Sequence, residues 1–322
     1  MSYISVKEAS KKWGISERRI RILCSEGRVD GVIRSGWAWN IPSSAQKPGD
    51  GRKIRHVKNF DLRTGTINFT PLNNIRESLK AIDIEKSDFL HYFDASVNRF
   101  LSSIFISENL KPAQVISILE GNFVKELSLN QHLLVTNAKS IIVDFFFETG
   151  LACQANDSPK SNPFFSEKRL MSIQNRLFSG IDDFYRSSFR DVDIPFAGAW
   201  AQDNRSYSVK VQMETLLVQC DNEWTNINGV VKSAFLFGEL LRIKPFKEHS
   251  FIFASLILAG SLLDCGYPLS PVSSEDFLEL KADLSLTLKR GNYNKILRLF
   301  EKSIQKEYGM IKDLLKTQES LT

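Results

Sequence analysis

The chain has 322 residues, with 42 Lys and Arg against 37 Asp and Glu, and 43% of its residues are hydrophobic. This composition excludes a disordered chain, a collagen-like chain and a disulfide scaffold, and the length indicates about two domains at about 150 residues each. The charge is unevenly distributed, because residues 1–58 contain 13 Lys and Arg but 5 Asp and Glu. Positive charge is therefore concentrated in a small N-terminal piece.

The N-terminus lacks a basic segment followed by an apolar one, which predicts no secretory signal and a cytoplasmic protein. The longest uncharged apolar run, residues 250–263, is shorter than the roughly 20 residues that span a bilayer, so we expect a buried helix and no membrane partner. The four cysteines and four histidines are dispersed, and none of them has the spacing of a metal or redox site. We therefore expect free thiols and no metal site made of histidines.

Residues 1–45 are predicted to form a small domain that begins with a helix. Ser5 and Glu8 have the S-x-x-E spacing of a capping box, in which each side chain accepts a hydrogen bond from the other residue's backbone. This spacing predicts a helix over residues 6–13.

A second helix and a hairpin are expected next. Ser16 is a candidate N-cap, apolar residues then recur at helical spacing, and Gly27 is a candidate end. Residues 28–42 alternate apolar and polar side chains around a Ser-Gly pair, which is typical of a β-hairpin. A hairpin that follows two such helices is a wing.

The exposed face of the second helix is predicted to be basic near its start. In helix-turn-helix docking this end meets base edges in the major groove, and arginine suits bidentate contact with guanine or phosphate. Arg34 and Lys12 are placed to contact the DNA backbone. The alternative is a solvated basic helix on a domain that binds protein. The predicted DNA-binding residues are Ser16, Arg18, Arg19, Arg21, Arg34 and Trp37.

Residues 3–42 resemble the winged helix-turn-helix of the MerR and excisionase type. The resemblance implies that the domain binds double-stranded DNA through the second helix and the wing. The matching segments are residues 3–9, 13–16, 20–21, 26–31 and 37–42.

The remaining chain is predicted to be a linker followed by a helical domain. Residues 42–53 are rich in Pro, Gly and Ser, and we place the linker at residues 46–73 and the second domain at residues 74–322. The fold class is mainly α, with a short β-flap near residues 206–211. The expected helices cover residues 88–106, 113–120, 131–148, 166–178, 211–226, 229–242, 251–265 and 274–290.

The segment around residue 244 resembles the motif of the Fic (Fido) family. A helix over residues 230–243 leads into Lys244-Pro245-Phe246-Lys247-Glu248-His249-Ser250 and then into an apolar helix. The family motif is I-H-P-F-x-[D/E]-G-N-G-R-x-x-R. The resemblance covers roughly residues 85–290 and implies a helical domain with a flap at residues 199–210.

The family transfers a nucleotide monophosphate, usually adenylate from ATP, to a protein hydroxyl. Its histidine is the general base, its carboxylate holds Mg²⁺, its glycine turn presents amides to phosphate and its arginines clamp the phosphate. Here Lys244 takes the base position and Glu248 keeps the carboxylate. The residues at the turn are His249, Ser250 and Phe251, and those at the arginine positions are Ile252 and Ser255.

The departures from the motif predict an inactive domain, because phosphoryl transfer depends almost entirely on positioning and electrostatics. A protonated lysine is a poor base, and a turn without glycine does not readily aim several amides at one anion. We therefore expect no cofactor and no metal. In the alternative, an active enzyme, ATP and Mg²⁺ are cofactors and Glu248 is the metal ligand.

A second, weaker match concerns regulation. Families of this fold carry an inhibitory helix with Ser or Thr four residues before a Glu, and residues 102–112 are similar, with Ser103 five residues before Glu108. Glu108 is thus a candidate inhibitory residue. The alternative is a residue at a helix end.

The leading hypothesis is a DNA-binding transcriptional regulator with an inactive Fic-like domain that serves in ligand sensing, oligomerisation or partner binding. Its expected partners are double-stranded DNA, a second copy of the chain and an unidentified protein. The first alternative is an active protein adenylyltransferase with an N-terminal regulatory DNA-binding module. The second is an N-terminal module that binds protein.

Overall fold

The computed structural model divides into two compact units, Met1–Asn59 and Phe60–Thr322. The division falls inside residues 46–73, the segment interpreted as a linker. Each unit is described by itself. The structure describes residues 2–25, 29, 31–36, 38–48, 68–79, 87–149, 165–181, 188–190, 207–224, 226–269 and 274–319.

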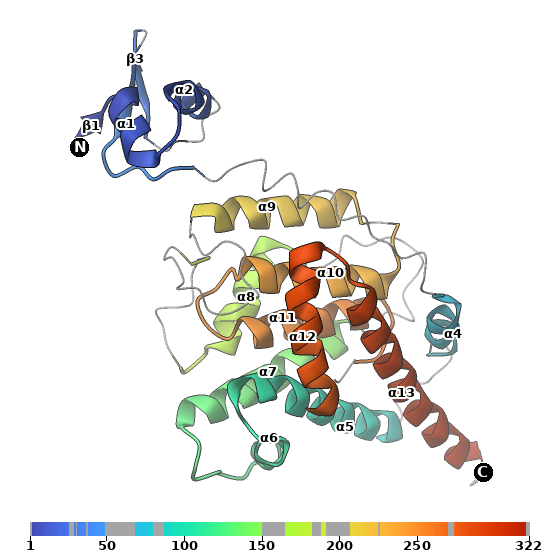
Figure 1. Ribbon diagram of the computed structural model, residues 1–322. Helices are drawn as coiled ribbons and strands as arrows, with labels where there is room; N and C mark the ends of the chain where they lie inside the picture. Colours follow the sequence, from blue (N-terminus) through green and yellow to red (C-terminus); the bar gives the residue numbers. More distant parts are fainter. Residues whose placement is uncertain are drawn as a thin grey trace. The chain divides into compact units, whose positions relative to one another are not determined.

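The described part of the N-terminal unit combines two helices with a three-stranded antiparallel sheet (Figure 1). Its elements are β1 (Tyr3–Ile4), α1 (Val6–Trp13), α2 (Glu17–Ser25), β2 (Ile33–Ser35) and β3 (Ala38–Pro42). Strand β3 is central, with β1 on one side and β2 on the other. Tyr3 lies opposite Pro42, and Ile33 lies opposite Asn40. The hairpin was predicted, whereas β1 was not.

Local hydrogen bonds explain where the first helix begins and ends. The Ser5 hydroxyl accepts the N–H of Glu8 at 3.2 Å, and the Glu8 carboxylate accepts the N–H of Ser5 at 2.7 Å, so the predicted capping box is confirmed. Helix α1 ends at Gly14, whose φ of 63° is left-handed and suits glycine. A separate small core holds the unit together: Val6, Ala9, Trp13, Ile20, Leu23, Cys24, Val29 and Ile41.

The larger unit is a helical assembly (Figure 1). Its described elements are α4 (Thr70–Leu79), α5 (Ser87–Ile104), the 3₁₀ turn η2 (Phe105–Glu108), α6 (Pro112–Leu119), α7 (Leu129–Thr149), α8 (Glu167–Leu177), α9 (Tyr207–Asn222), α10 (Gly229–Ile243), α11 (Ser250–Asp264), α12 (Ser274–Arg290) and α13 (Asn294–Glu319).

Helices α10 and α11 form the centre of this unit, with α7 packed on α11 and with α9, α12 and α13 packed on α10 (Figure 1). Every residue of α10 from Val230 to Ile243 except Lys232 is buried. Gly238 allows the ring of Tyr293 to lie against α10, because a Cβ there would lie 2.5 Å from the ring atom Cε1. The centre therefore depends on a close approach of Tyr293 to the helix backbone.

A buried carboxylate joins the last helix to α5. Glu307 on α13 is 1% exposed and accepts hydrogen bonds from the Tyr92 hydroxyl at 2.7 Å and the Ser96 hydroxyl at 3.0 Å. Arg99 donates to both of its oxygens, at 3.1 and 2.7 Å. A buried charge needs such partners, and this cluster supplies them from three positions on α5.

The mainly α fold and all eight expected helices are confirmed, with boundaries that differ by a few residues. The linker was predicted to end at residue 73, but α4 already begins at Thr70, so the helical domain begins earlier than predicted. Helices α4 and α13 were not among the expected helices. Among the described residues, no helix combines the length and the apolar character needed to cross a membrane.

The expected β-flap is wrong where it can be examined. Residues 207–211 form the start of α9, while residues 199–206 lie outside the described residues. The alternation Tyr-Ser-Val-Lys-Val looks like a strand, but Val209, Met213 and Leu216 are buried at helical spacing. Packing against α10 overrides the local pattern.

Candidate functional site

The turn between α1 and α2 sets the start of the candidate DNA-binding helix. The Ser10 hydroxyl donates to the carbonyl of Ile15 at 2.7 Å, and the Ser16 hydroxyl accepts the N–H of Arg19 at 3.3 Å. Ser16 therefore caps α2, and its hydroxyl is engaged with the protein backbone. Helix α2 buries Ile20 and Leu23, so its opposite side faces solvent.

The three arginines of α2 lie outside the buried side of the helix. Arg18 and Arg21 are exposed and Arg19 is half-buried. Arg21 Nη2 donates to Glu17 Oε2 at 2.8 Å, one helical turn earlier, and both side chains of this pair are exposed. The side chains of Arg18 and Arg19 make no hydrogen bond or ion pair with any residue in the described part of the chain.

The hairpin of β2 and β3 carries a further arginine. Arg34 on β2 donates through Nε to the carbonyl of Gly36 at 3.3 Å, and its guanidinium lies 5.3 Å from the centre of the Trp39 ring. Lys12, expected to contact DNA phosphate, donates one hydrogen bond to the carbonyl of Ser43. Trp37, the remaining predicted residue, lies outside the described residues.

In the larger unit, the loop between α10 and α11 contains the residues that resembled a motif. Lys244 ends α10 with a left-handed φ of 48°, and His249 precedes α11 with a φ of 50°. Such values are uncommon for residues other than glycine and store local strain. The loop is thus bounded at both ends by left-handed residues.

Arg190 holds the first half of this loop. It is 6% exposed, and its Nε donates to the carbonyl of Lys244 at 2.8 Å. Its Nη2 lies 3.4 Å from the carbonyl of Ile243, and its own N–H donates to the carbonyl of Pro245 at 2.8 Å. A cation at the carbonyl end of α10 is favourable for the helix dipole. Sequence reasoning did not identify Arg190, because it lies in no motif.

Lys244 occupies a half-buried position. Burial, and then the nearby charge of Arg190, lower the pKa of its ammonium below the ordinary value for lysine. Its amine forms no hydrogen bond or ion pair with the residues that the structure describes.

Glu108 and His249 meet across the fold. Oε1 of Glu108, at the end of η2, lies 3.0 Å from Nδ1 of His249, although the two atoms are not aligned as a hydrogen bond. The His249 ring also lies 5.5 Å from the ring of Phe178. Both residues were candidates from the sequence, but the contact between them was not predicted, because they lie 141 residues apart in the chain.

The positions where the family motif has arginines are filled by the core. Ile252 and Ser255 are buried, and Ser255 faces a gap of about 10 Å³. This volume is about that needed by a single water molecule. The aromatic rings around this gap are Phe100, Phe237, Phe251, Phe277 and Phe300.

The other motif residues differ in their exposure to solvent. Glu248 is exposed, Ser250 begins α11 with its hydroxyl 3.4 Å from the carbonyl of Phe246, and Pro245 and Phe246 are buried. Within the described ranges, no group of three or more His, Cys, Asp or Glu side chains could hold a metal ion.

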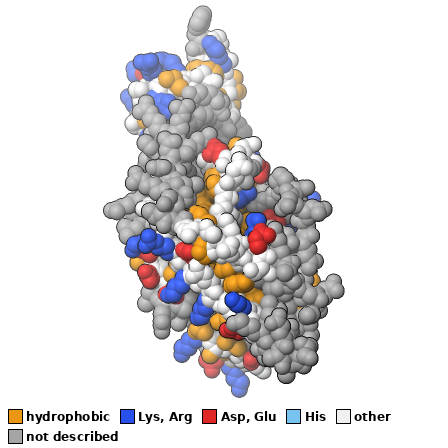
Figure 2. Space-filling model, turned by 90° about the vertical axis from the view of Figure 1, so that its right-hand side faces the viewer, with side chains coloured by type: hydrophobic (Ala, Val, Ile, Leu, Met, Phe, Trp, Pro, Cys, Tyr) orange, Lys and Arg blue, Asp and Glu red, His pale blue; other side chains and the backbone are white. Residues whose placement is uncertain are grey.

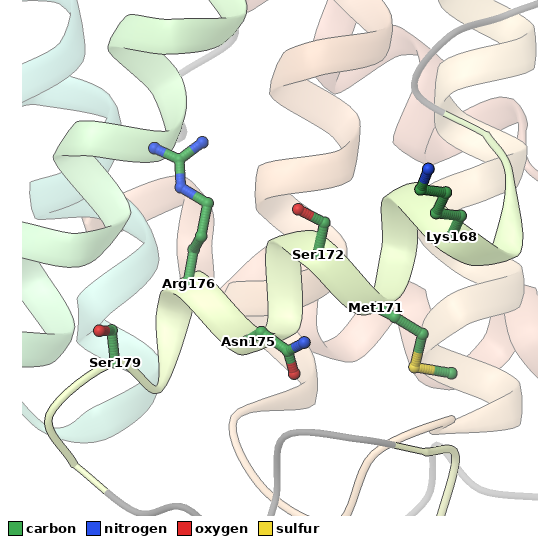
Figure 3. Close-up of a pocket in the computed structure, with 6 residues that line it drawn as sticks. All are labelled: Lys168, Met171, Ser172, Asn175, Arg176 and Ser179. Atoms are coloured by element: carbon green, nitrogen blue, oxygen red, sulfur yellow. The ribbon is translucent and has the colours of Figure 1, made fainter.

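An open hollow of about 440 Å³ lies along α8, and none of its lining residues belongs to the motif (Figure 3). One of its lining residues, Arg176, donates to Asp144 at 2.5 Å and to Ser140 at 3.1 Å. Its cation is therefore already neutralised by the protein. The lining residues are Lys168, Met171, Ser172, Asn175, Arg176 and Ser179.

Comparison with known proteins identifies the fold of the larger unit. No family model and no curated protein sequence matches the chain. A structure of Fic-1 from C. elegans matches with a TM-score of 0.60 over 84% of this chain and 77% of its own, at 15% identity. A Fic domain containing signaling protein from Bacteroides thetaiotaomicron matches with a TM-score of 0.60 over 78% of this chain and 97% of its own, at 17% identity. The larger unit has a Fic-type fold.

A third structure agrees with this assignment. A Fic family protein from Desulfovibrio desulfuricans matches with a TM-score of 0.56 over 76% of each chain, at 15% identity. Identities this low establish the fold alone. In the Fic-type domain of this chain, the segment that resembled the family motif is the loop between α10 and α11 together with the first turns of α11.

Proposed function

We propose that the chain is a DNA-binding transcriptional regulator whose N-terminal unit is a winged helix-turn-helix and whose Fic-type domain transfers no nucleotide. The observation that carries the proposal is the capped helix α2, which presents Arg18 and Arg21 to solvent beside a wing that carries Arg34. This arrangement suits insertion of the start of a helix into the major groove.

Charge supports a nucleic-acid partner for this unit. Figure 2 shows Lys and Arg side chains gathered on the N-terminal unit. Residues 1–58 contain 13 Lys and Arg against 5 Asp and Glu. Cations that neutralise phosphates release counterions, which gives sequence-independent affinity. A single winged helix reads few bases, so a homodimer would supply a second half-site.

The motif loop supports inactivity. The described residues do not fit a nucleotide phosphate, because Ile252 and Ser255 lie in the aromatic core and the gap beside Ser255 has room for about one water molecule. Under this proposal the domain needs neither ATP nor Mg²⁺, and it serves in partner or effector binding.

Titration of duplex DNA with the full chain tests DNA binding. We expect wild-type protein to bind duplex DNA with an affinity that falls steeply with salt, and R18A/R19A/R21A to lose at least roughly tenfold. The matched control is K125A/K306A/K312A, which removes three exposed cations from the larger unit and should bind like wild type. Absent binding, or equal binding by both triple variants, would refute DNA recognition through α2. Partner binding that persists in high salt would favour a protein-binding module.

The second candidate is an active adenylyltransferase. It is favoured by the Fic-type fold, by Pro245, Phe246 and Glu248, and by the lowered pKa of Lys244, which increases the neutral fraction of a possible base. Incubation with labelled ATP and Mg²⁺ decides between the two. Label on the protein or on a lysate target that disappears in E248A would establish the enzyme, whereas no label in either protein supports inactivity.

A further inference from the structure

The recognition-type helix contains an acid where acids are unfavourable for DNA binding. Glu17 is the first residue of α2, in the same turn as Arg18, and a carboxylate there would lie close to DNA phosphates in the proposed docking. It lies beside Arg21, with Nη2 of Arg21 at 2.8 Å from its Oε2. The other two arginines of the helix have no such partner among the described residues.

Glu17 contributes little to the stability of α2. An acid at a helix start is worth roughly 0.3–1 kcal/mol, and an exposed Glu and Arg pair one turn apart about 0.2–0.5 kcal/mol. The side chains are 41% and 57% exposed, so water screens the pair. The relevant effect is geometric, because the carboxylate favours one orientation of the guanidinium, with Nη2 toward Glu17.

The donors that remain on Arg21 suit one kind of base. A guanidinium has five N–H donors, and Glu17 accepts from one of its nitrogens, which leaves donors for a second planar partner. Guanine presents N7 and O6 as adjacent acceptors in the major groove, and the paired cytosine presents an N4 donor that a carboxylate can accept. A joined arginine and glutamate therefore match both halves of a G·C base pair.

Resting on the proposed DNA binding, we infer that Glu17 and Arg21 together read one G·C base pair: Arg21 contacts guanine, and Glu17 is a positioning residue that orients Arg21 and accepts from cytosine. Arg18 has no partner holding its guanidinium in the described structure and contacts phosphate without reading sequence. Specificity and general affinity thus come from different arginines of the same helix.

The test begins with the full chain and a pool of duplexes that contain a random segment, from which bound sequences are selected. Affinities are then measured for the best duplex and for each of its single base-pair replacements, with wild type, E17Q, R21K and R18Q. Circular dichroism checks that each variant is folded.

We expect wild type to lose roughly tenfold or more when one particular G·C pair is replaced by A·T. E17Q and R21K should lose most of this discrimination at that pair while keeping the preferences at other positions. R18Q should weaken binding to all duplexes alike and keep the discrimination.

Two outcomes would overturn the inference. If E17Q binds every duplex more tightly with unchanged preferences, Glu17 only repels phosphate and the reading role is wrong, although DNA binding stands. If wild type binds no duplex, the proposed function fails and the inference fails with it.

Discussion

At the scale of single residues, the positions that sequence predicted best are those whose partners are close in the chain. The capping box of Ser5 and Glu8 and the bounds of the first helix, residues 6–13, depend on neighbours within a few residues, and the structure has both. The contacts of Arg190 with the end of α10, and of Glu108 with His249, join segments far apart in the chain. No local pattern carries information on such pairs, so they appear only in the folded chain.

Lys244 provides a prediction at this scale. The folded state disfavours its charged form, so its pKa is lowered and the unfolded chain binds more protons between the folded pKa and about 10.4. The destabilisation is therefore complete below the folded pKa and disappears as pH rises toward 10.4. We expect K244M to have a higher urea midpoint than wild type at pH 7, with a difference that shrinks as pH rises to 10.

The exposed Lys125 is the control for this experiment. K125M should show no comparable pH-dependent difference from wild type. An equal or lower urea midpoint for K244M at pH 7 would mean that the lysine charge is stabilised in the fold, contrary to its surroundings.

At the scale of elements, the spacing of apolar residues predicted the buried helices. Where it predicted a strand in place of a helix, at the start of α9, packing explains the difference. Helix α13 has buried Leu297, Phe300 and Ile304 at helical spacing, a signal that sequence reasoning could have used. The start of α9 alternates like a strand and is nevertheless helical, because α10 offers a surface for one side of a helix. Where a segment has both strand-like alternation and helical spacing, the sequence thus predicts that an element is present better than it predicts whether the element is a strand or a helix.

Two glycines test the close packing of helices. Gly238 on α10 lies against Tyr293, where a Cβ would lie 2.5 Å from the ring, whereas Gly309 on α13 has no atom within 4 Å of such a position. We expect G238A to lose about 1–3 kcal/mol of unfolding free energy in urea, because the buried ring must shift. G309A should gain about 0.4–1 kcal/mol, because alanine restricts the unfolded chain and favours helix. Equal effects of the two changes would contradict the packing described for α10.

At the scale of the whole molecule, the buried residues that the structure describes form two hydrophobic cores that share no residue. The division into two parts and the basic character of the first were predictable, because composition changes sharply between them. The state of the motif loop was predictable only in part. The sequence indicated missing arginines, but the aromatic filling around Ser255 depends on α5, α12 and α13.

Separate cores predict a separate response to ligand. Duplex DNA at 100 times its dissociation constant stabilises the unit that binds it by about 2.7 kcal/mol. We expect hydrogen exchange to slow in α1 and α2 on addition of DNA, while amides of α10 and α11 exchange at unchanged rates. ATP with Mg²⁺ should slow neither set. Slower exchange in α11 with ATP would instead support a nucleotide site in the Fic-type domain.

The burial of α10 on all sides has a consequence for synthesis of the chain. Two of the helices that cover α10, α12 and α13, follow it in the chain, so the larger core cannot close until both of these helices have been synthesised. The described strands and helices of the N-terminal unit end at Pro42, so this unit can fold early in synthesis, before α10 leaves the ribosome. A nascent chain would then carry a folded N-terminal unit while the apolar helices α10 and α11 are still uncovered, so we expect the Fic-type domain to be the part that is exposed to aggregation during synthesis.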